Sequence, residues 1–265
     1  MSEQTSAAKI EIRDVTIAYD DFIVMRGLNA KIKKSEIFVV MGGSGSGKST
    51  LLRVMVGLKE PGQGEVFYDG VPFWKSKEDE RQKLLRSFGV MFQGGALWSS
   101  MTLAENVGLP LGEFTELSEE EIEDIARFKL ALVGLKGFED FYPAEISGGM
   151  TKRAGLARAL ALDPDILFFD EPSSGLDPVT ARKLDELILQ LRDSLGTTFV
   201  VVSHDLASIF TIADNSIFLD GKTHTMGAQG NPRELLERST DPTLHEFLTR
   251  GETDGRKTVL ESKPA

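Results

Sequence analysis

The chain has 265 residues, 41% of them hydrophobic, which suits one large α/β domain or one domain with a small lobe. It has no Cys, which excludes disulfides and thiolate metal sites, and its three His residues are too scattered for a zinc site. The formal net charge of -11 argues against a general nucleic-acid binder, which usually carries a basic face.

No apolar run approaches the ~18 residues that a membrane-spanning helix needs. Residues 1–9 are polar and lack the apolar core of a signal peptide. We therefore expect a cytoplasmic protein without membrane spans, so that any membrane role comes through a protein partner.

The first predicted elements are strands. Residues 10–19 alternate apolar and polar side chains, which is typical of an antiparallel strand with one exposed face. Residues 36–41 form a continuous apolar run, and a glycine-rich loop and a helix follow it. Short strands are expected at 64–68, before an Asp-Gly turn signal, and at 88–92.

The pattern becomes helical from about residue 96 to residue 161. Ser118 and Glu121 form a capping box before one of the helices. We interpret this stretch as a helical subdomain inserted into the α/β core.

Strands return at 166–169 and 198–202, with an amphipathic helix over 178–195 between them. Strands that alternate with helices imply a mostly parallel, covered sheet. We expect residues 1–250 to form one domain and the polar residues 251–265 to be a disordered tail.

A phosphate-binding loop is predicted at 42–49, where the chain matches the pattern G-x-x-x-x-G-K-S/T. Glycines let successive backbone N–H groups face an anion, and the following helix adds the positive end of its dipole. Lys48 would reach the β- and γ-phosphates, and Ser49 would bind Mg2+. The alternative is a flexible Gly/Ser loop, which the strand before it and the helix after it disfavour. The residues expected to hold the phosphates are Gly42, Gly43, Ser44, Gly45, Ser46, Gly47, Lys48, Ser49 and Thr50.

Two carboxylates, Asp170 and Glu171, end the apolar strand at 166–169. If this strand lies beside the strand of the phosphate loop, Asp170 would reach the metal and Glu171 would polarise the attacking water. The alternative is a solvated acidic turn, which the phosphate loop makes less favourable.

The segment 146–150 reads Ile-Ser-Gly-Gly-Met and resembles the L-S-G-G-Q signature of the ABC ATPase family. In that family, the signature binds the γ-phosphate of the nucleotide held by the other subunit. Ser147, Gly148 and Gly149 at a helix N-terminus suit an anion, although a plain helix cap with flexible glycines is the alternative. The chain departs from the pattern at Met150, where Gln is commonest, and at Ile146, which replaces Leu.

Other motifs of the family follow in order. The resemblance implies that Gln93 touches Mg2+, that Asp177 crosses a dimer interface and that His204 contacts the γ-phosphate. Tyr19 resembles the aromatic residue that stacks on adenine, although an aromatic at a strand end often serves packing.

The resemblance covers about residues 10–248 and implies an α/β fold: a P-loop NTPase core with a mostly parallel sheet, an antiparallel β subdomain and an inserted α-helical subdomain. It implies ATP hydrolysis with Mg2+, which Ser49, Gln93 and Asp170 would bind. The implied catalytic residues are Glu171, His204 and Gln93. Since the chain carries one core, the shared sites require a partner core, most simply a second copy of the chain.

Three segments resemble a narrower group, the ATPases of Mce/Mla-type lipid-transport systems. They are residues 92–102, residues 103–111, and the Ser-Gly-Gly-Met signature with Lys152-Arg153. The resemblance implies a permease, a lipid-binding Mce protein and, in some systems, a STAS-type subunit, at the cytoplasmic side of the inner membrane. Leu97 and Trp98 would face a permease helix, unless they pack inside the helical subdomain.

Alternative functions stay open at this point. The ATPase of a polar amino-acid or other solute importer would share every catalytic motif. A soluble ABC protein of translation, DNA repair or iron–sulfur assembly would lack the permease. A non-hydrolysing ATP-binding scaffold is a third alternative, which Glu171 and His204 disfavour.

Overall fold

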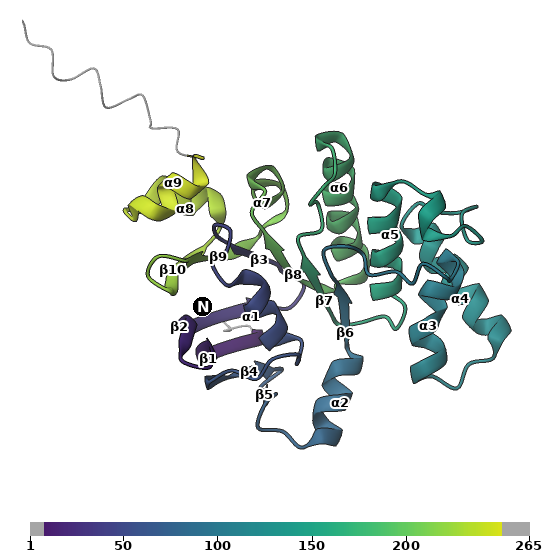
Figure 1. The fold of residues 1–265 in the computed structure, drawn as a ribbon, viewed down its shortest axis with the longest axis horizontal. Helices are drawn as coiled ribbons and strands as arrows, with labels where there is room; N and C mark the ends of the chain where they lie inside the picture. Colours follow the sequence, from purple (N-terminus) through teal and green to yellow (C-terminus); the bar gives the residue numbers. More distant parts are fainter. Residues whose placement is uncertain (1–7, 251–265) are drawn as a thin grey trace, which may run out of the picture.

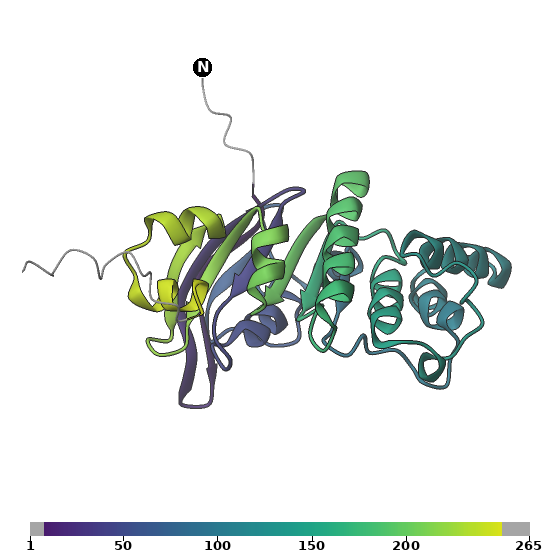
Figure 2. The same ribbon diagram turned by 90° about the horizontal axis from the view of Figure 1, so that it is seen from above.

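The computed structural model describes residues 8–250, so the tail predicted at 251–265 lies outside the described residues. The molecule is elongated, with β-sheet at one end and a group of helices at the other (Figures 1 and 2). Within residues 8–250, no helix combines the length and apolarity needed to cross a bilayer.

An antiparallel sheet forms one end of the molecule, with the strand order β2-β1-β4-β5. Its strands are β1 (Ala8–Tyr19), β2 (Phe22–Lys33), β4 (Gln63–Tyr68) and β5 (Val71–Pro72). Ile10 and Ile12 of β1 are buried, and after a register shift between Ile12 and Val15 the same alternation continues with Val15 and Ile17, so the strand keeps the predicted single covered face. The β1–β2 hairpin pairs Tyr19 with Phe22 at its tip.

The second sheet has the order β10-β9-β3-β8-β7-β6. Its strands are β3 (Ile37–Met41), β6 (Phe88–Met91), β7 (Ile166–Asp170), β8 (Thr198–Ser203), β9 (Asn215–Asp220) and β10 (Thr225–Gly230). All neighbours pair in parallel except β10, which runs antiparallel to β9. The predicted α/β fold class, with a mostly parallel sheet and an antiparallel β part, is confirmed.

The strand order corrects one expectation. Strand β7, which ends in Asp170, does not pair with β3, because β8 lies between them. A parallel connection crosses over through a helix and does not have to join adjacent strands. Strand β8 ends one residue before His204. The strand order therefore also brings His204 to the edge of the sheet at which Asp170 and Glu171 lie.

The helices are α1 (Lys48–Met55), α2 (Glu78–Arg86), α3 (Leu103–Phe114), α4 (Glu119–Leu132), α5 (Gly148–Ala159), α6 (Pro178–Leu195), α7 (Leu206–Ile212), α8 (Pro232–Arg238) and α9 (Pro242–Leu248). Helices α3, α4 and α5 pack together in the helical part of the molecule (Figure 2). The predicted capping box of α4 is present: Ser118 Oγ accepts from Glu121 N, and Ser118 N donates to Glu121 Oε2. Helix α2 was not predicted, because none of its side chains is buried and it carries no apolar stripe.

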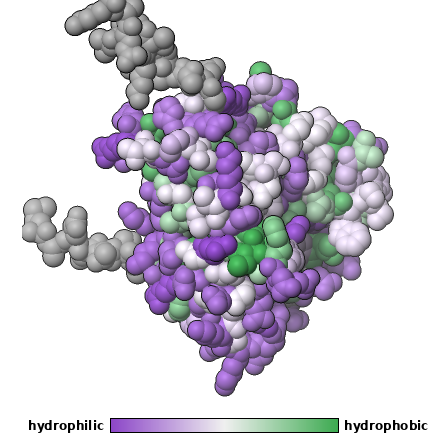
Figure 3. All heavy atoms as spheres, turned by 60° about the vertical axis from the view of Figure 1, so that its left-hand side comes forward, coloured by the Kyte–Doolittle hydropathy of each residue, from purple (hydrophilic) through white to green (hydrophobic). Residues whose placement is uncertain are grey.

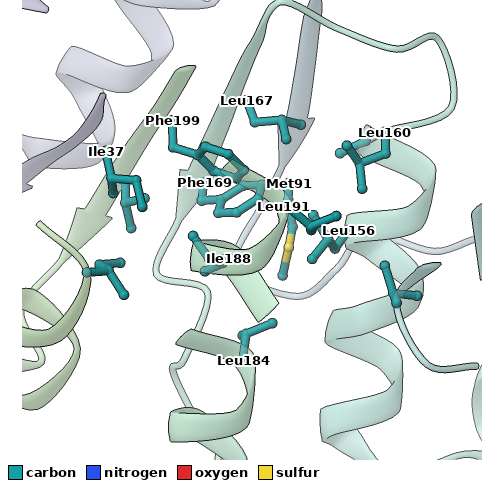
Figure 4. Packing of buried hydrophobic residues seen from close by; sticks show 14 of the residues in the cluster. Ile37, Met91, Leu156, Leu160, Leu167, Phe169, Leu184, Ile188, Leu191 and Phe199 are labelled. Atoms are coloured by element: carbon teal, nitrogen blue, oxygen red, sulfur yellow. The ribbon is translucent and has the colours of Figure 1, made fainter. Parts of the chain in front are cut away.

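Two hydrophobic clusters cover opposite faces of the parallel sheet, because alternate side chains of each strand point to opposite sides. Ile37 and Val39 belong to the first cluster, and Phe38 and Val40 belong to the second. Figure 4 shows the first cluster, in which side chains of α6 pack on Phe169 and Phe199.

The helical part and the sheet approach each other closely at Gly89 in β6. A Cβ at this position would overlap the carbonyl oxygen of Ala159 in α5 and lie 2.6 Å from Leu167 Cδ2. Backbone atoms of α5 can therefore reach the edge strand because residue 89 has no side chain.

We predict that Gly89→Ala lowers the free energy of unfolding by about 1–3 kcal/mol, the usual range for an overpacked core. Gly112→Ala is the matched control. Gly112 lies in α3, and its Cβ would be at an ordinary contact distance of 3.8 Å from Ile122 Cδ1 in α4. The control should keep or slightly raise stability, because Ala favours a helix. Chemical denaturation of both variants measures the effect, and equal stability of the two would contradict the close approach.

Candidate functional site

The glycine-rich loop joins β3 to α1 at the carboxyl edge of the parallel sheet. Gly47 caps α1 with a left-handed φ of 85°, and the Lys48 ammonium donates to the carbonyl oxygens of Gly42 and Gly43, each at 2.9 Å. Burial lowers the pKa of Lys48, while the charges of Glu171 and Asp170 act in the opposite direction. The lysine is thus folded back over its own loop, close to both carboxylates.

The loop fits an anion in two further respects. Ser46 Oγ is buried and has no hydrogen-bond partner among the described residues. Gly43 and Gly45 have open space where a Cβ would stand, so the backbone is accessible there. Together with the free first-turn amides of α1, these groups can surround phosphate oxygens.

Ser49 and Asp170 meet beside this loop. Ser49 Oγ donates to Asp170 Oδ1 at 2.9 Å, although the two residues come from α1 and the end of β7. A hydroxyl and a carboxylate are oxygen ligands of the kind that Mg2+ prefers. The pair is therefore suited to hold this ion next to bound phosphates.

Glu171 and His204 form a second pair at the same edge. Glu171 Oε1 lies 2.7 Å from His204 Nδ1, and the Glu171 amide donates to Val202 O at 2.9 Å. Glu171 is 9% exposed and has a φ of 52°, a left-handed conformation that is uncommon for a residue with a side chain. The backbone thus turns sharply after Asp170 and directs the two neighbouring carboxylates to different partners.

Gln93 follows β6, the strand beside β7. Its side-chain amide donates to Ser174 Oγ at 3.2 Å, in the loop that follows Glu171. The main-chain carbonyl oxygen of Gln93 accepts a hydrogen bond from the ammonium of Lys152 in α5. Arg158 of the same helix donates to the main-chain carbonyl oxygens of Gly95 and Ala96. The sequence does not predict this contact of Lys152 and Arg158, because the inward direction of their side chains depends on how α5 packs.

Ser147 caps helix α5, and its Oγ accepts from Met150 N at 3.3 Å. In both ribbon views α5 lies in the helical part, apart from α1 (Figures 1 and 2). Helix α5, which Ser147 caps, therefore lies away from the helix that follows the phosphate loop in the same copy.

Asp177 lies next to this signature segment. Its Oδ1 caps α6 by accepting from Val179 N and Thr180 N, and hydrogen bonds from Thr180 in particular hold the pKa of Asp177 below its usual value. A Cβ on Gly149 would lie 2.5 Å from Thr180 Cγ2, so the N-termini of α5 and α6 are in close contact.

Tyr19 lies at the tip of the β1–β2 hairpin and is 45% exposed. The ammonium of Lys59 lies 3.8 Å from the centre of its ring. The surface at this end of the molecule is mostly hydrophilic, with a small hydrophobic area (Figure 3). Exposure disfavours a pure packing role, and adenine stacking by Tyr19 stays a prediction.

Leu97 and Trp98 behave differently from each other. Leu97 is partly buried and packs against the first hydrophobic cluster, which fits the alternative that it packs inside the helical subdomain. Trp98 is 59% exposed, and the fully buried Asn106 fixes its backbone by accepting from Trp98 N and donating to Trp98 O. A groove of about 300 Å³ lies between α2, β6, α3 and α5, with Phe114 in its wall.

Comparison with known families and proteins gives clear similarities. A family described as ABC transporter matches residues 25–174. The intermembrane phospholipid transport system ATP-binding protein MlaF of Haemophilus influenzae is 40% identical over 247 residues, which are 93% of this chain and 92% of that protein. The probable ribonucleotide transport ATP-binding protein mkl of Mycobacterium tuberculosis is 41% identical over 239 residues, 90% of this chain and 66% of that protein.

Among solved structures, the chain resembles the ATP-binding cassette MJ0796, described as a dimer in a post-hydrolysis state bound to ADP and Pi. The TM-score is 0.75 at 32% sequence identity, over 84% of this chain and 98% of that chain.

Proposed function

This chain belongs to the ABC transporter family, and we propose that it is the ATP-hydrolysing subunit that powers phospholipid transport between membranes. One observation supports the catalytic part best: the phosphate loop, the Ser49–Asp170 pair and the Glu171–His204 pair meet at one edge of the sheet. The phospholipid part rests on the similarity to MlaF over nearly the whole length of both chains.

The residues of this edge have distinct roles in the proposed reaction. The loop amides and Lys48 bind the β- and γ-phosphates, while Tyr19 stacks on the adenine. Glu171 accepts a proton from a water molecule as that water attacks the γ-phosphorus, and the bond to the ADP oxygen breaks. His204 holds the Glu171 carboxylate in position. The rate comes from positioning and charge stabilisation, as is usual for phosphoryl transfer.

Ser49, Asp170 and Gln93 are the proposed ligands of Mg2+. Their oxygen donors suit the ion, and Ser49 and Asp170 already lie 2.9 Å apart. When bound, Mg2+ would neutralise charge on the β- and γ-phosphates. Gln93 approaches from the neighbouring strand, so its side chain links this site to the helical part.

A second copy of the chain completes each site in this proposal. Helix α5, which begins at the signature residues Ser147, Gly148 and Gly149, lies apart from α1 of its own chain, and these residues would bind the γ-phosphate held by the other copy. Asp177 lies beside the signature and would cross the same interface. ATP would therefore close the dimer, and loss of the γ-phosphate would open it.

We predict that Glu171→Gln lowers ATP turnover by at least about 100-fold, since a positioned base contributes that much or more. ATP binding should persist, because the phosphate loop is unchanged, and the dimer should stay closed. Glu139→Gln is a matched control, because Glu139 is also 9% exposed but lies outside the site. Steady-state ATPase assays and size-exclusion chromatography with ATP measure both effects; normal turnover of Glu171→Gln would contradict the assigned role.

We also predict complementation between two inactive variants. Lys48→Ala removes the phosphate-binding ammonium, and Ser147→Arg blocks the signature, so neither variant alone should hydrolyse ATP. In a mixture, about a quarter of the sites pair an intact loop with an intact signature if copies combine at random. Recovery of roughly that fraction of activity supports shared sites, and a mixture as inactive as its parts would contradict them.

A permease would dock at the surface near Trp98. The occupant we propose is a cytoplasmic helix of that permease, because Trp98 is an exposed aromatic side chain on a loop whose backbone is hydrogen-bonded to the buried Asn106. We further propose an Mce-type lipid-binding protein, with a STAS-type subunit as an additional component. The chain would then act at the cytoplasmic side of the inner membrane.

A second candidate function follows from the similarity to mkl, whose name assigns it to ribonucleotide transport. The same catalytic edge would serve either cargo, because the ATPase site does not touch the transported molecule. The partner and its bound cargo therefore decide between the two functions.

The deciding experiment is purification of the tagged chain from detergent-solubilised native membranes, with mass spectrometry of the proteins and lipids. We expect a permease, an Mce-type protein and enriched phospholipid. Trp98→Ala should lose the permease, whereas Phe128→Ala, which is equally exposed at 59%, should retain it. A solute permease without enriched phospholipid would overturn the lipid assignment and leave the ATPase assignment intact.

A further inference from the structure

We infer that Lys152 is a positioning residue, which holds the main chain of Gln93 against helix α5 so that the Gln93 side chain can reach the metal. The inference rests on the metal role proposed above for Gln93. It assigns a function to a residue of the signature helix whose side chain is buried within its own chain.

The surroundings of Lys152 point to this role. The residue is 7% exposed, and its ammonium donates to the carbonyl oxygen of Gln93. Burial lowers the pKa of Lys152, and the charges of Glu171 and Asp170 oppose that shift. The ammonium therefore lies within electrostatic reach of both carboxylates, between the helical part and the catalytic edge.

A comparison with Lys129 separates this role from ordinary core packing. Lys129 is also buried, but its ammonium pairs with the carboxylate of Asp163. Lys152 has a neutral carbonyl as its hydrogen-bond partner in the structure. Burying an ammonium is costly, and an apolar side chain of similar length would fill the same space at lower cost. The charge at position 152 is therefore better explained by its hydrogen bond to the Gln93 carbonyl oxygen than by a contribution to the stability of the fold.

The loop after Gln93 is fastened to the same helix by further contacts. A Cβ on Gly155 would lie 3.0 Å from the Cα of Gly95, so loop and helix backbones touch. Arg158 donates to Ala96 O at 2.7 Å and to Gly95 O at 3.0 Å. The main chain at 93–96 therefore follows α5, while the Gln93 side chain extends to Ser174 beside the catalytic edge.

Through this hydrogen bond, Lys152 couples the position of Gln93 to the position of α5. If α5 shifts relative to β7, the carbonyl of Gln93 moves with Lys152, and the side-chain amide moves away from the edge. Without the Lys152 ammonium, the main chain of Gln93 would lose its hydrogen bond to α5, although Arg158 would still bind the carbonyl oxygens of Gly95 and Ala96. The defect should therefore appear at Gln93 and in metal use, with nucleotide binding by the phosphate loop preserved.

The test compares Lys152→Met with the control Lys129→Met and with the conservative Lys152→Arg in the full-length chain. In nucleotide-free protein, Lys152→Met should speed amide hydrogen exchange around residues 93–95 roughly tenfold, and Lys129→Met should not. At saturating ATP, the Mg2+ concentration for half-maximal ATPase activity should rise roughly tenfold in Lys152→Met. Binding of a fluorescent ATP analogue in EDTA should match wild type, and Lys152→Arg should restore most of the Mg2+ response.

A double variant shows whether Lys152 acts through Gln93. In a Gln93→Ala background, Lys152→Met should change the Mg2+ response by less than about twofold, because residues of one network are not additive. The inference would be overturned if Lys152→Met shifted the Mg2+ response of the Gln93→Ala variant by the full factor of roughly tenfold. It would also be overturned if Lys152→Met alone showed wild-type amide hydrogen exchange at 93–95 or an unchanged Mg2+ response. If Gln93→Ala alone leaves the Mg2+ response unchanged, the metal role of Gln93 is wrong, and the exchange data still decide whether Lys152 positions the loop. Lys152→Gln serves for the same comparisons if Lys152→Met does not fold.

Discussion

The parallel alignment of β3, β8, β7 and β6 is the constraint on which the site depends. Parallel strands end at the same edge, so residues that follow different strands meet there although they are far apart in the chain. Asp170 thereby reaches Ser49, and Glu171 reaches His204. The sheet can bring these groups together because both faces are covered by apolar clusters, which leaves one edge for polar chemistry.

The helical part is joined to this edge by contacts that need small residues. Gly89 admits the backbone of Ala159, and Gly155 admits the backbone of Gly95. Such close approaches hold two rigid bodies at a defined distance more firmly than long side chains do, because backbone atoms have few alternative positions. Side chains of α5 then add charge-assisted hydrogen bonds to a fixed geometry.

Much of the fold and of the candidate site could be predicted from the sequence. The loop pattern, the acidic strand end and the alternation of strands with helices each follow from short-range chemistry, and together they predict Ser49, Asp170 and Glu171. His204 is predicted only by the resemblance to the ABC ATPase family. Strand order could not be predicted, because crossover connections leave it open, and the insertion of β8 was missed. The partial burial of Leu97 and the inward direction of Lys152 depend on packing between distant segments, which no local pattern encodes.

Asp177 shows how one side chain can separate folding from assembly. Its Oδ1 accepts both capping hydrogen bonds of α6, and Oδ2 takes no part in that cap. The cap of α6 therefore uses one oxygen of this carboxylate, and the other oxygen is the one that would face the second copy in the proposed dimer. An amide at this position could keep the capping oxygen and turn the outer atom into a donor. If Asp177 crosses the proposed dimer interface, a change of this single atom would alter the interface and leave the cap of α6 in place.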